Sequence, residues 1–117
     1  MVIVSGFMAL PAGCANASAP NFDSSNPVSC LVIFGVAANG AKQVSNPTAA
    51  SEMVERASFL AEQNGGTEWI TKVTPESMRI GAGMEAAHDE RATLKLLDEC
   101  VAKQNADPAF QSRISRR

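Results

Sequence analysis

The sequence predicts an all-α fold, a small bundle of four or five helices closed by one disulfide between Cys30 and Cys100. Apolar residues recur at steps of three and four along most of the chain after Pro27, which is the periodicity of amphipathic helices. The 117 residues suit a single domain, and 45% hydrophobic against 19% charged residues is an ordinary balance for a folded protein. Two of the three cysteines lie in helical segments far apart in the chain, so a bond between them ties the bundle together.

The first expected helix covers about residues 29 to 44, with Ser29 available as its N-cap. Its apolar stripe consists of Cys30, Ile33, Phe34, Ala37, Ala38 and Ala41. A break follows at Asn46, and Pro47 suits the first turn of a second helix. The small alanine side chains predict that these two helices approach each other closely.

The second expected helix runs from Pro47 to a strong stop at Asn64-Gly65-Gly66. Its stripe consists of Ala50, Met53, Val54, Ala57, Leu60 and Ala61. Glu52 and Arg56 stand four residues apart and are expected to pair on its exposed side.

The segment Thr67 to Val73 contains β-branched residues, but no partner strand is evident, so we expect a brief helical turn that carries Trp69 into the core. Thr74-Pro75-Glu76-Ser77 then predicts the start of a third helix, with a capping hydroxyl and a proline in the first turn. Gly81 and Gly83 weaken this helix and predict a bend or two pieces.

A further helix is expected from about Glu85 to Lys103. One face of it carries Thr93, Leu94, Leu97, Cys100 and Val101. Asp107-Pro108 opens a last short turn, from which Phe110 is expected to fold back onto the core.

The beginning of the chain differs in composition from the rest and predicts a leader over residues 1–17, a linker over 18–27 and the helical domain over 28–117. No charged residue occurs before Asp23, and residues 1–12 form an apolar run of signal-peptide length, too short to span a membrane. The small residues around Ala15 and Ala17 fit a signal peptidase, and Pro20 favours cleavage after Ala17.

Signal peptides open with a basic residue, which this segment lacks. Either the natural start lies upstream, or residues 1–13 form a buried N-terminal element. Gly6, Pro11 and Gly13 would break any long helix there, so we favour the leader.

Residues Leu10-Pro11-Ala12-Gly13-Cys14 resemble the lipobox of bacterial lipoproteins, in which the cysteine is acylated and becomes the new N-terminus. In that family an aliphatic residue stands three positions before the cysteine, where this chain has Pro11. Cys14 is therefore a candidate lipidation site, ranked behind ordinary secretion, and a lipid anchor there is the one membrane contact we expect.

If Cys14 is removed or acylated, Cys30 and Cys100 form an even pair, as in proteins of oxidising compartments. The alternative is two buried free thiols in a cytosolic protein. Neither cysteine belongs to a C-x-x-C motif, so redox catalysis and zinc binding are not expected.

The sequence contains no strong catalytic signature, so we expect no enzyme activity, no cofactor and no metal. His88, the one histidine, forms Glu85-x-x-His88, but metal sites of that type need a second copy, and a solvated helix face explains it better. No Gly-x-Ser-x-Gly elbow or phosphate-binding loop is present. The net charge of −2 and the absence of a basic stripe argue against a nucleic-acid partner.

The most suggestive apolar group consists of Trp69, Ile70, Met78, Ile80 and Met84. Core packing is the first interpretation of this set. The second is an interaction surface for another protein or a small ligand, formed by Trp69, Ile70, Met78 and Met84 if they prove exposed.

Three short segments resemble small uncharacterised exported proteins of Gram-negative bacteria. They are Cys30-Leu-Val-Ile-Phe34, Gly65-Gly66 and Leu96-Leu97-Asp98-Glu99-Cys100, within about residues 28 to 110. The resemblance implies a helical fold with one long-range disulfide and no particular activity. In architecture the chain is also similar to acid-stress periplasmic chaperones of the HdeA type, which are small, helical and closed by one disulfide.

The sequence therefore predicts a non-enzymatic exported protein, periplasmic or extracellular or anchored by lipid, that binds an unidentified protein or small ligand. The alternative is a periplasmic stress chaperone that exposes apolar surface when its carboxylates are protonated.

Overall fold

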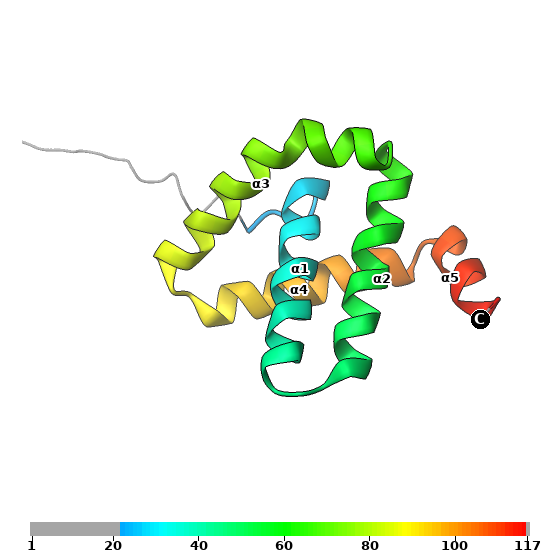
Figure 1. Cartoon of the computed structure of the whole chain (residues 1–117), viewed down its shortest axis with the longest axis horizontal. Helices are drawn as coiled ribbons and strands as arrows, with labels where there is room; N and C mark the ends of the chain where they lie inside the picture. The colour runs from blue at the N-terminus through cyan, green and yellow to red at the C-terminus, as the bar shows by residue number, and fades with distance from the viewer. Residues whose placement is uncertain (1–21, 117) are drawn as a thin grey trace, which may run out of the picture.

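The computed structural model describes residues 22–116, and in that range it contains five helices and no strand (Figure 1). The helices are α1 (Pro27–Gln43), α2 (Pro47–Asn64), α3 (Thr67–Ala87), α4 (Glu90–Asn105) and α5 (Pro108–Ser115). The predicted all-α class is confirmed. The predicted leader, Cys14 within it and residues 18–21 of the predicted linker lie outside the described residues.

Four of the helices begin with a side-chain cap from Asn or Asp. The side chains of Asn26, Asn46, Asp89 and Asp107 accept backbone N–H groups at the starts of α1, α2, α4 and α5. In α1, α2 and α5 the cap is followed at once by a proline, whose missing N–H costs nothing in the first turn. The start expected for the first helix was two residues late, because Asn26 caps it and Ser29 is fully buried inside it.

The third helix is continuous over 21 residues, which corrects the expected fresh start at Thr74-Pro75. Pro75 removes the N–H that would bond to the carbonyl of Thr71, but both residues are exposed, so water can satisfy that carbonyl. Buried Val73, on one side of the proline, and Ile80, on the other, both pack on the core and hold the helix together. Figure 1 shows α3 curving over the N-terminal end of α1.

The helix expected from Glu85 to Lys103 is interrupted in the structure. α3 ends at Ala87, His88 takes a left-handed conformation with φ of 49°, and Asp89 caps α4. Histidine is one of the residue types that adopt this conformation more readily than most. His88 therefore lies on the exposed turn between two helices, not on a helix face.

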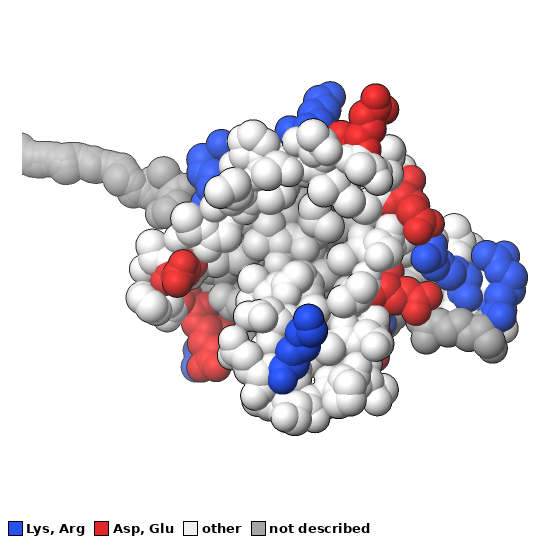
Figure 2. Space-filling model, in the orientation of Figure 1, with Lys and Arg blue, Asp and Glu red and all other residues white. Residues whose placement is uncertain are grey.

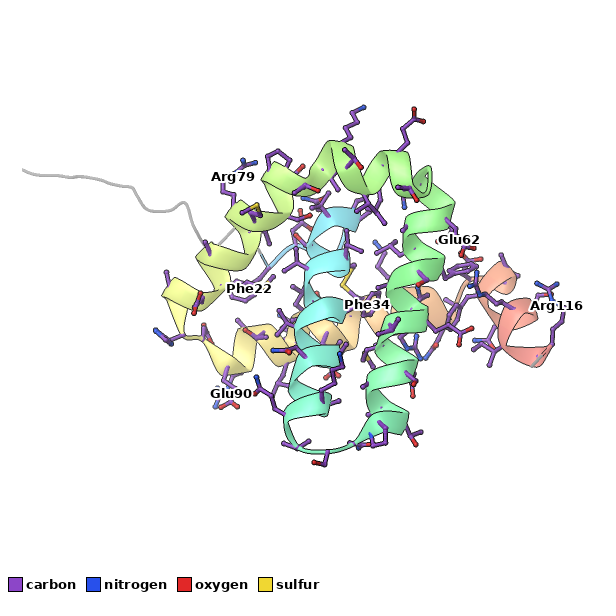
Figure 3. The ribbon with its side chains drawn as sticks, in the orientation of Figure 1. Phe22, Phe34, Glu62, Arg79, Glu90 and Arg116 are labelled. Carbon is purple, nitrogen blue, oxygen red and sulfur yellow. A yellow bond between two sulfur atoms is a disulfide. The ribbon has the colours of Figure 1, made fainter. Side chains whose placement is uncertain are left out.

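The core forms where α1 packs against the other long helices. Its buried cluster consists of Val28, Cys30, Ile33, Phe34, Val73, Ile80, Met84, Leu96 and Cys100. Ala38 of α1 and Ala50 and Ala61 of α2 are also buried. Figure 1 shows α1 beside α2, with α4 crossing behind both. Figure 3 shows Phe22, which precedes α1, directed toward the interior, and Phe34 next to the disulfide.

The predicted disulfide is present. The α-carbons of Cys30 and Cys100 are 5.6 Å apart, and the bond spans 70 positions of sequence. The helix that carries Cys100 was expected to end at about Lys103, but α4 continues to Asn105. The bond joins the first turn of α1 to α4, so two elements from opposite ends of the described chain are held together.

Candidate interaction face

The apolar residues that the sequence singled out on α3 lie on two different sides of that helix. Met84 is 7% exposed and belongs to the core, and Trp69 is partly buried against the same cluster. Ile70 and Met78 are 42% and 69% exposed. Met84 and Trp69 therefore pack on the core, whereas Ile70 and Met78 are exposed and available to a partner.

The exposed side of α1 is unusually free of charge. No charged residue occurs between Pro27 and Ala41, and Lys42 is the single charged residue of the helix. Gly35, Val36 and Asn39 are exposed, Val36 by 50%. A helix that is apolar all round is normally buried on all sides, so the exposed side of α1 is a candidate contact surface.

The adjoining helices extend this uncharged surface. On α2, Val54 is 54% exposed and stands between the exposed Ser51 and Ser58. On α3, Ile70, Thr74 and Met78 follow one another at steps of four, and are thus on one side of the helix. A β-carbon added to Gly81, one turn further on, would lie 3.9 Å from Val32 of α1, so α1 and α3 are close neighbours here.

We call this surface the uncharged face. It comprises Gly35, Val36 and Asn39 of α1, Ser51, Val54 and Ser58 of α2, and Ile70, Thr74 and Met78 of α3. In Figure 2 the surface over these three helices is mostly white and hollowed in its middle, one cationic side chain lies over the lower half of α1, and the other charged side chains lie at its edge. Lys42, Glu55 and Arg113 border the part of the face that α2 contributes.

The side of α2 that faces α4 and α5 is polar, and it holds α5 in place. Arg56 is 7% exposed, which corrects its expected position on an exposed helix side. Its guanidinium donates to Glu52 at 3.2 Å, to Gln104 at 3.0 Å and to Asn105 at 3.1 Å. Gln104 in turn donates to the backbone carbonyl of Arg56 at 2.9 Å. Nothing in the sequence pattern distinguished this buried arginine from an exposed one.

Aromatic rings pack against the same arginines. Arg56 lies 5.0 Å from the centre of the Phe110 ring, and Phe110 meets Phe59 edge to face with ring centres 5.2 Å apart. Arg113 lies over the Phe59 ring at 5.5 Å and donates to Glu62 at 2.6 Å. Phe110 is 1% exposed, so it folds back onto α2 as the sequence predicted.

Hydrogen bonds with α5 and its cap shift the pKa values of three side chains in this region. The side-chain hydrogen bond from Arg113 lowers the pKa of Glu62, and Glu62 in return raises the pKa of Arg113. The hydrogen bond from Gln63, assisted by the backbone N–H of Ala109, lowers the pKa of Asp107. Figure 3 shows Glu62 directed toward α5. The bonds from Arg113 to Glu62 and from Gln63 to Asp107 join α2 to α5 and its cap, so both depend on the docking of α5.

A cavity of about 190 Å³ lies beside the disulfide. Phe34 and Leu60 contribute apolar walls, and Cys30 and Cys100 line it at 6% and 2% exposure. Two polar residues at its border already have partners: Lys103 donates to the carbonyl of Ser24 at 3.0 Å, and Gln63 donates to Asp107 at 2.7 Å.

Among residues 22–116, no group of three or more His, Cys, Asp or Glu side chains is placed to hold a metal ion. In the same range, no helix is both long enough and apolar enough to cross a membrane. Comparison of the chain with models of protein families, with curated proteins and with solved structures found no match in any of the three.

Proposed function

We propose that this chain is a non-enzymatic exported protein of the bacterial envelope, periplasmic, extracellular or lipid-anchored, that binds a partner through the uncharged face. The observation that carries the proposal is the buried disulfide between Cys30 and Cys100. Structural disulfides persist in oxidising compartments and are rare in the reducing cytosol. The apolar start of the chain, with no charge before Asp23, is the export signal that this compartment requires.

The binding role follows from the uncharged face. Exposed aliphatic side chains gathered on neighbouring helices, with charged residues at the edge, are typical of protein–protein contact surfaces. Val36, Val54, Ile70 and Met78 are each at least 42% exposed.

Export is tested by fusing residues 1–26 to an alkaline phosphatase that lacks its own signal and is active only after its disulfides form outside the cytosol. We expect phosphatase activity from the fusion. Replacing Val4 and Phe7 by Asp, which breaks the apolar run, abolishes it, and replacing Asn16 by Asp does not. All fusions carry an added Met-Lys-Lys start that supplies the basic residues with which signal peptides open. If the intact fusion is then as inactive as the double variant, the export proposal is wrong. A Cys14→Ser fusion that remains active but loses its incorporation of labelled palmitate identifies the lipid-anchored form.

One observation favours a second candidate, an acid-activated stress chaperone. The contacts that dock α5, and with it Phe110, onto Phe59 of α2 include two carboxylates with lowered pKa, Glu62 and Asp107. Their protonation weakens the docking of α5 and exposes the two rings. The chaperone predicts that an apolar dye binds at pH 3 while far-UV circular dichroism stays helical. Unchanged near-UV signals at pH 3 argue against it.

A further inference from the structure

We propose that the uncharged face is the interface of a homodimer, in which α1 packs antiparallel against α1 of a second copy. The inference rests on the proposed function in that it names the partner of the same face. It is argued from the charge of α1, from its glycines and from the size of the surface.

Charge favours a second copy as the occupant. A two-fold interface brings the same surface together with itself, so any charge near its centre meets its own copy and repels it. The face of α1 avoids this, because no charged residue occurs from Pro27 to Ala41. If the two helices cross at Gly35, each Lys42 lies seven residues from the crossing on opposite sides, so the two Lys42 backbones are about 20 Å apart along the helices. This separation exceeds the screening length of about 8 Å at physiological salt.

The glycines of α1 indicate close approach by another backbone. Glycine in the middle of a helix is unfavourable relative to alanine, and a β-carbon at Gly35 or Gly40 would meet no atom of this chain within 4 Å. Nothing inside the monomer therefore requires glycine at either position. A second helix crossing at Gly35 does require it, because the missing side chain lets the two helix axes come closer together.

The size of the surface is sufficient. α1 has 17 residues, which corresponds to about 25 Å of helix. α1 and α2 lie side by side at about 9 Å spacing, and α3 crosses the N-terminal end of α1 (Figure 1), so the face covers roughly 600 Å² in projection. Because side chains project from the surface, its accessible area is larger than its projected area. It therefore approaches the roughly 800 Å² that each partner contributes to a standard interface. Val54, Ile70 and Met78 then become the apolar periphery around the central α1 contact.

The experiment is sedimentation equilibrium of the full-length chain between about 1 and 300 μM, compared with three variants. The unmodified chain is expected to shift from the mass of one chain to the mass of two over this range. Gly35→Glu places a carboxylate at the centre of the contact, where two copies repel, and is expected to weaken association about tenfold or more.

Two matched variants separate the contact from general effects of charge and of stability. Leu94 of α4 is 54% exposed among Glu90, Arg91, Lys95 and Asp98, so Leu94→Glu adds the same charge to a surface outside the face and is expected to leave association unchanged. Met78→Glu, at the periphery of the face, is expected to weaken association by less than Gly35→Glu. Glutamate is also a better helix residue than glycine, so we expect Gly35→Glu to fold. Thermal unfolding of the variant checks this.

If the chain stays monomeric to 300 μM, the homodimer proposal is wrong. If its disulfide is nevertheless formed and its leader directs export, the proposed function stands and the partner is a different protein. A dimer that Gly35→Glu does not weaken overturns the placement of the interface at α1. A dimer weakened equally by Leu94→Glu shows that net charge rather than this face controls association, and it also contradicts the proposal.

Discussion

Gly35 and Gly65 differ in whether the structure of the monomer requires glycine. A β-carbon at Gly35 would contact nothing within 4 Å, whereas at Gly65 it would lie 3.1 Å from the β-carbon of Trp69, and φ there is +131°. We expect Gly35→Ala to raise the free energy of unfolding of the monomer by about 0.5–1 kcal/mol and Gly65→Ala to lower it by more than about 1 kcal/mol. Urea unfolding at low protein concentration measures both changes. A Gly35→Ala variant less stable than the parent contradicts the open space seen at this position.

Arg56 is the most connected charged residue of the polar side. Removing its guanidinium leaves the side-chain acceptors of Gln104 and Asn105 without their donor and takes a cation from the Phe110 ring. We expect Arg56→Ala to lower the free energy of unfolding by about 2–3 kcal/mol. Arg116→Ala, at an exposed position of the same region, serves as the control and is expected to change it by less than about 0.5 kcal/mol. Equal effects of the two substitutions would falsify the structural role of Arg56.

At the scale of the helix, Pro75 in α3 is tolerated rather than required. Pro75→Ala restores an N–H that can bond to the carbonyl of Thr71, so we expect it to raise the free energy of unfolding by about 1–3 kcal/mol. Pro47→Ala is the matched control, because Pro47 stands in the first turn of α2, where the N–H has no helical partner. Thermal unfolding compares the two variants, and a loss of stability on replacing Pro75 would mean that α3 needs the proline.

The docking of α5 is expected to depend on pH. The folded-state pKa values of Glu62 and Asp107 are lowered, so the stability they contribute is present above the unfolded values and is lost as pH falls below about 4. We expect the urea midpoint to decrease between pH 6 and pH 3. A Glu62→Gln, Asp107→Asn double variant is expected to show a smaller decrease, with lower stability at pH 6. If the parent and the double variant respond to acid identically, other carboxylates control the transition.

Helix boundaries show what the sequence could and could not predict at this scale. The bounds of α2 and the start of α5 were predicted from Pro-containing starts and a Gly-Gly stop, because these signals act on the local backbone. The last element was expected as a short turn, but α5 is a helix of eight residues. α3 was predicted in pieces, because Pro75 is a local signal and the buried Val73 and Ile80 that override it act through tertiary packing. The turn at His88 was missed because left-handed histidine has no strong sequence signature.

At the scale of the whole molecule, the disulfide is the covalent constraint that ties the beginning of the described chain to α4. It closes a loop of 70 positions, for which the chain-entropy model gives about 4 kcal/mol. This is a large share of the stability of a domain of this size. We expect a Cys30→Ser, Cys100→Ser double variant to remain helical but to unfold at a much lower urea concentration than the oxidised parent. A midpoint that does not change would show that packing alone closes the bundle.

The candidate face was only partly predictable. Periodicity identified the apolar residues of α3, but it could not show that Ile70 and Met78 remain exposed while Met84 is buried, because that depends on which side of α3 meets α1. The uncharged run from Pro27 to Ala41 is visible in the sequence. It first suggests a buried helix, and only the arrangement of the helices shows that one side of it stays open.

The state of the cysteines in the natural host tests the export of this disulfide-bonded domain most directly. Cells are lysed with excess iodoacetamide, and the intact mass of the protein is recorded without reduction. The account predicts that Cys30 and Cys100 carry no alkyl group and that the mass is lower by two hydrogens, on a chain that begins near Ser18 or at an acylated Cys14. Two alkylated cysteines on a chain that retains residues 1–17 would contradict it.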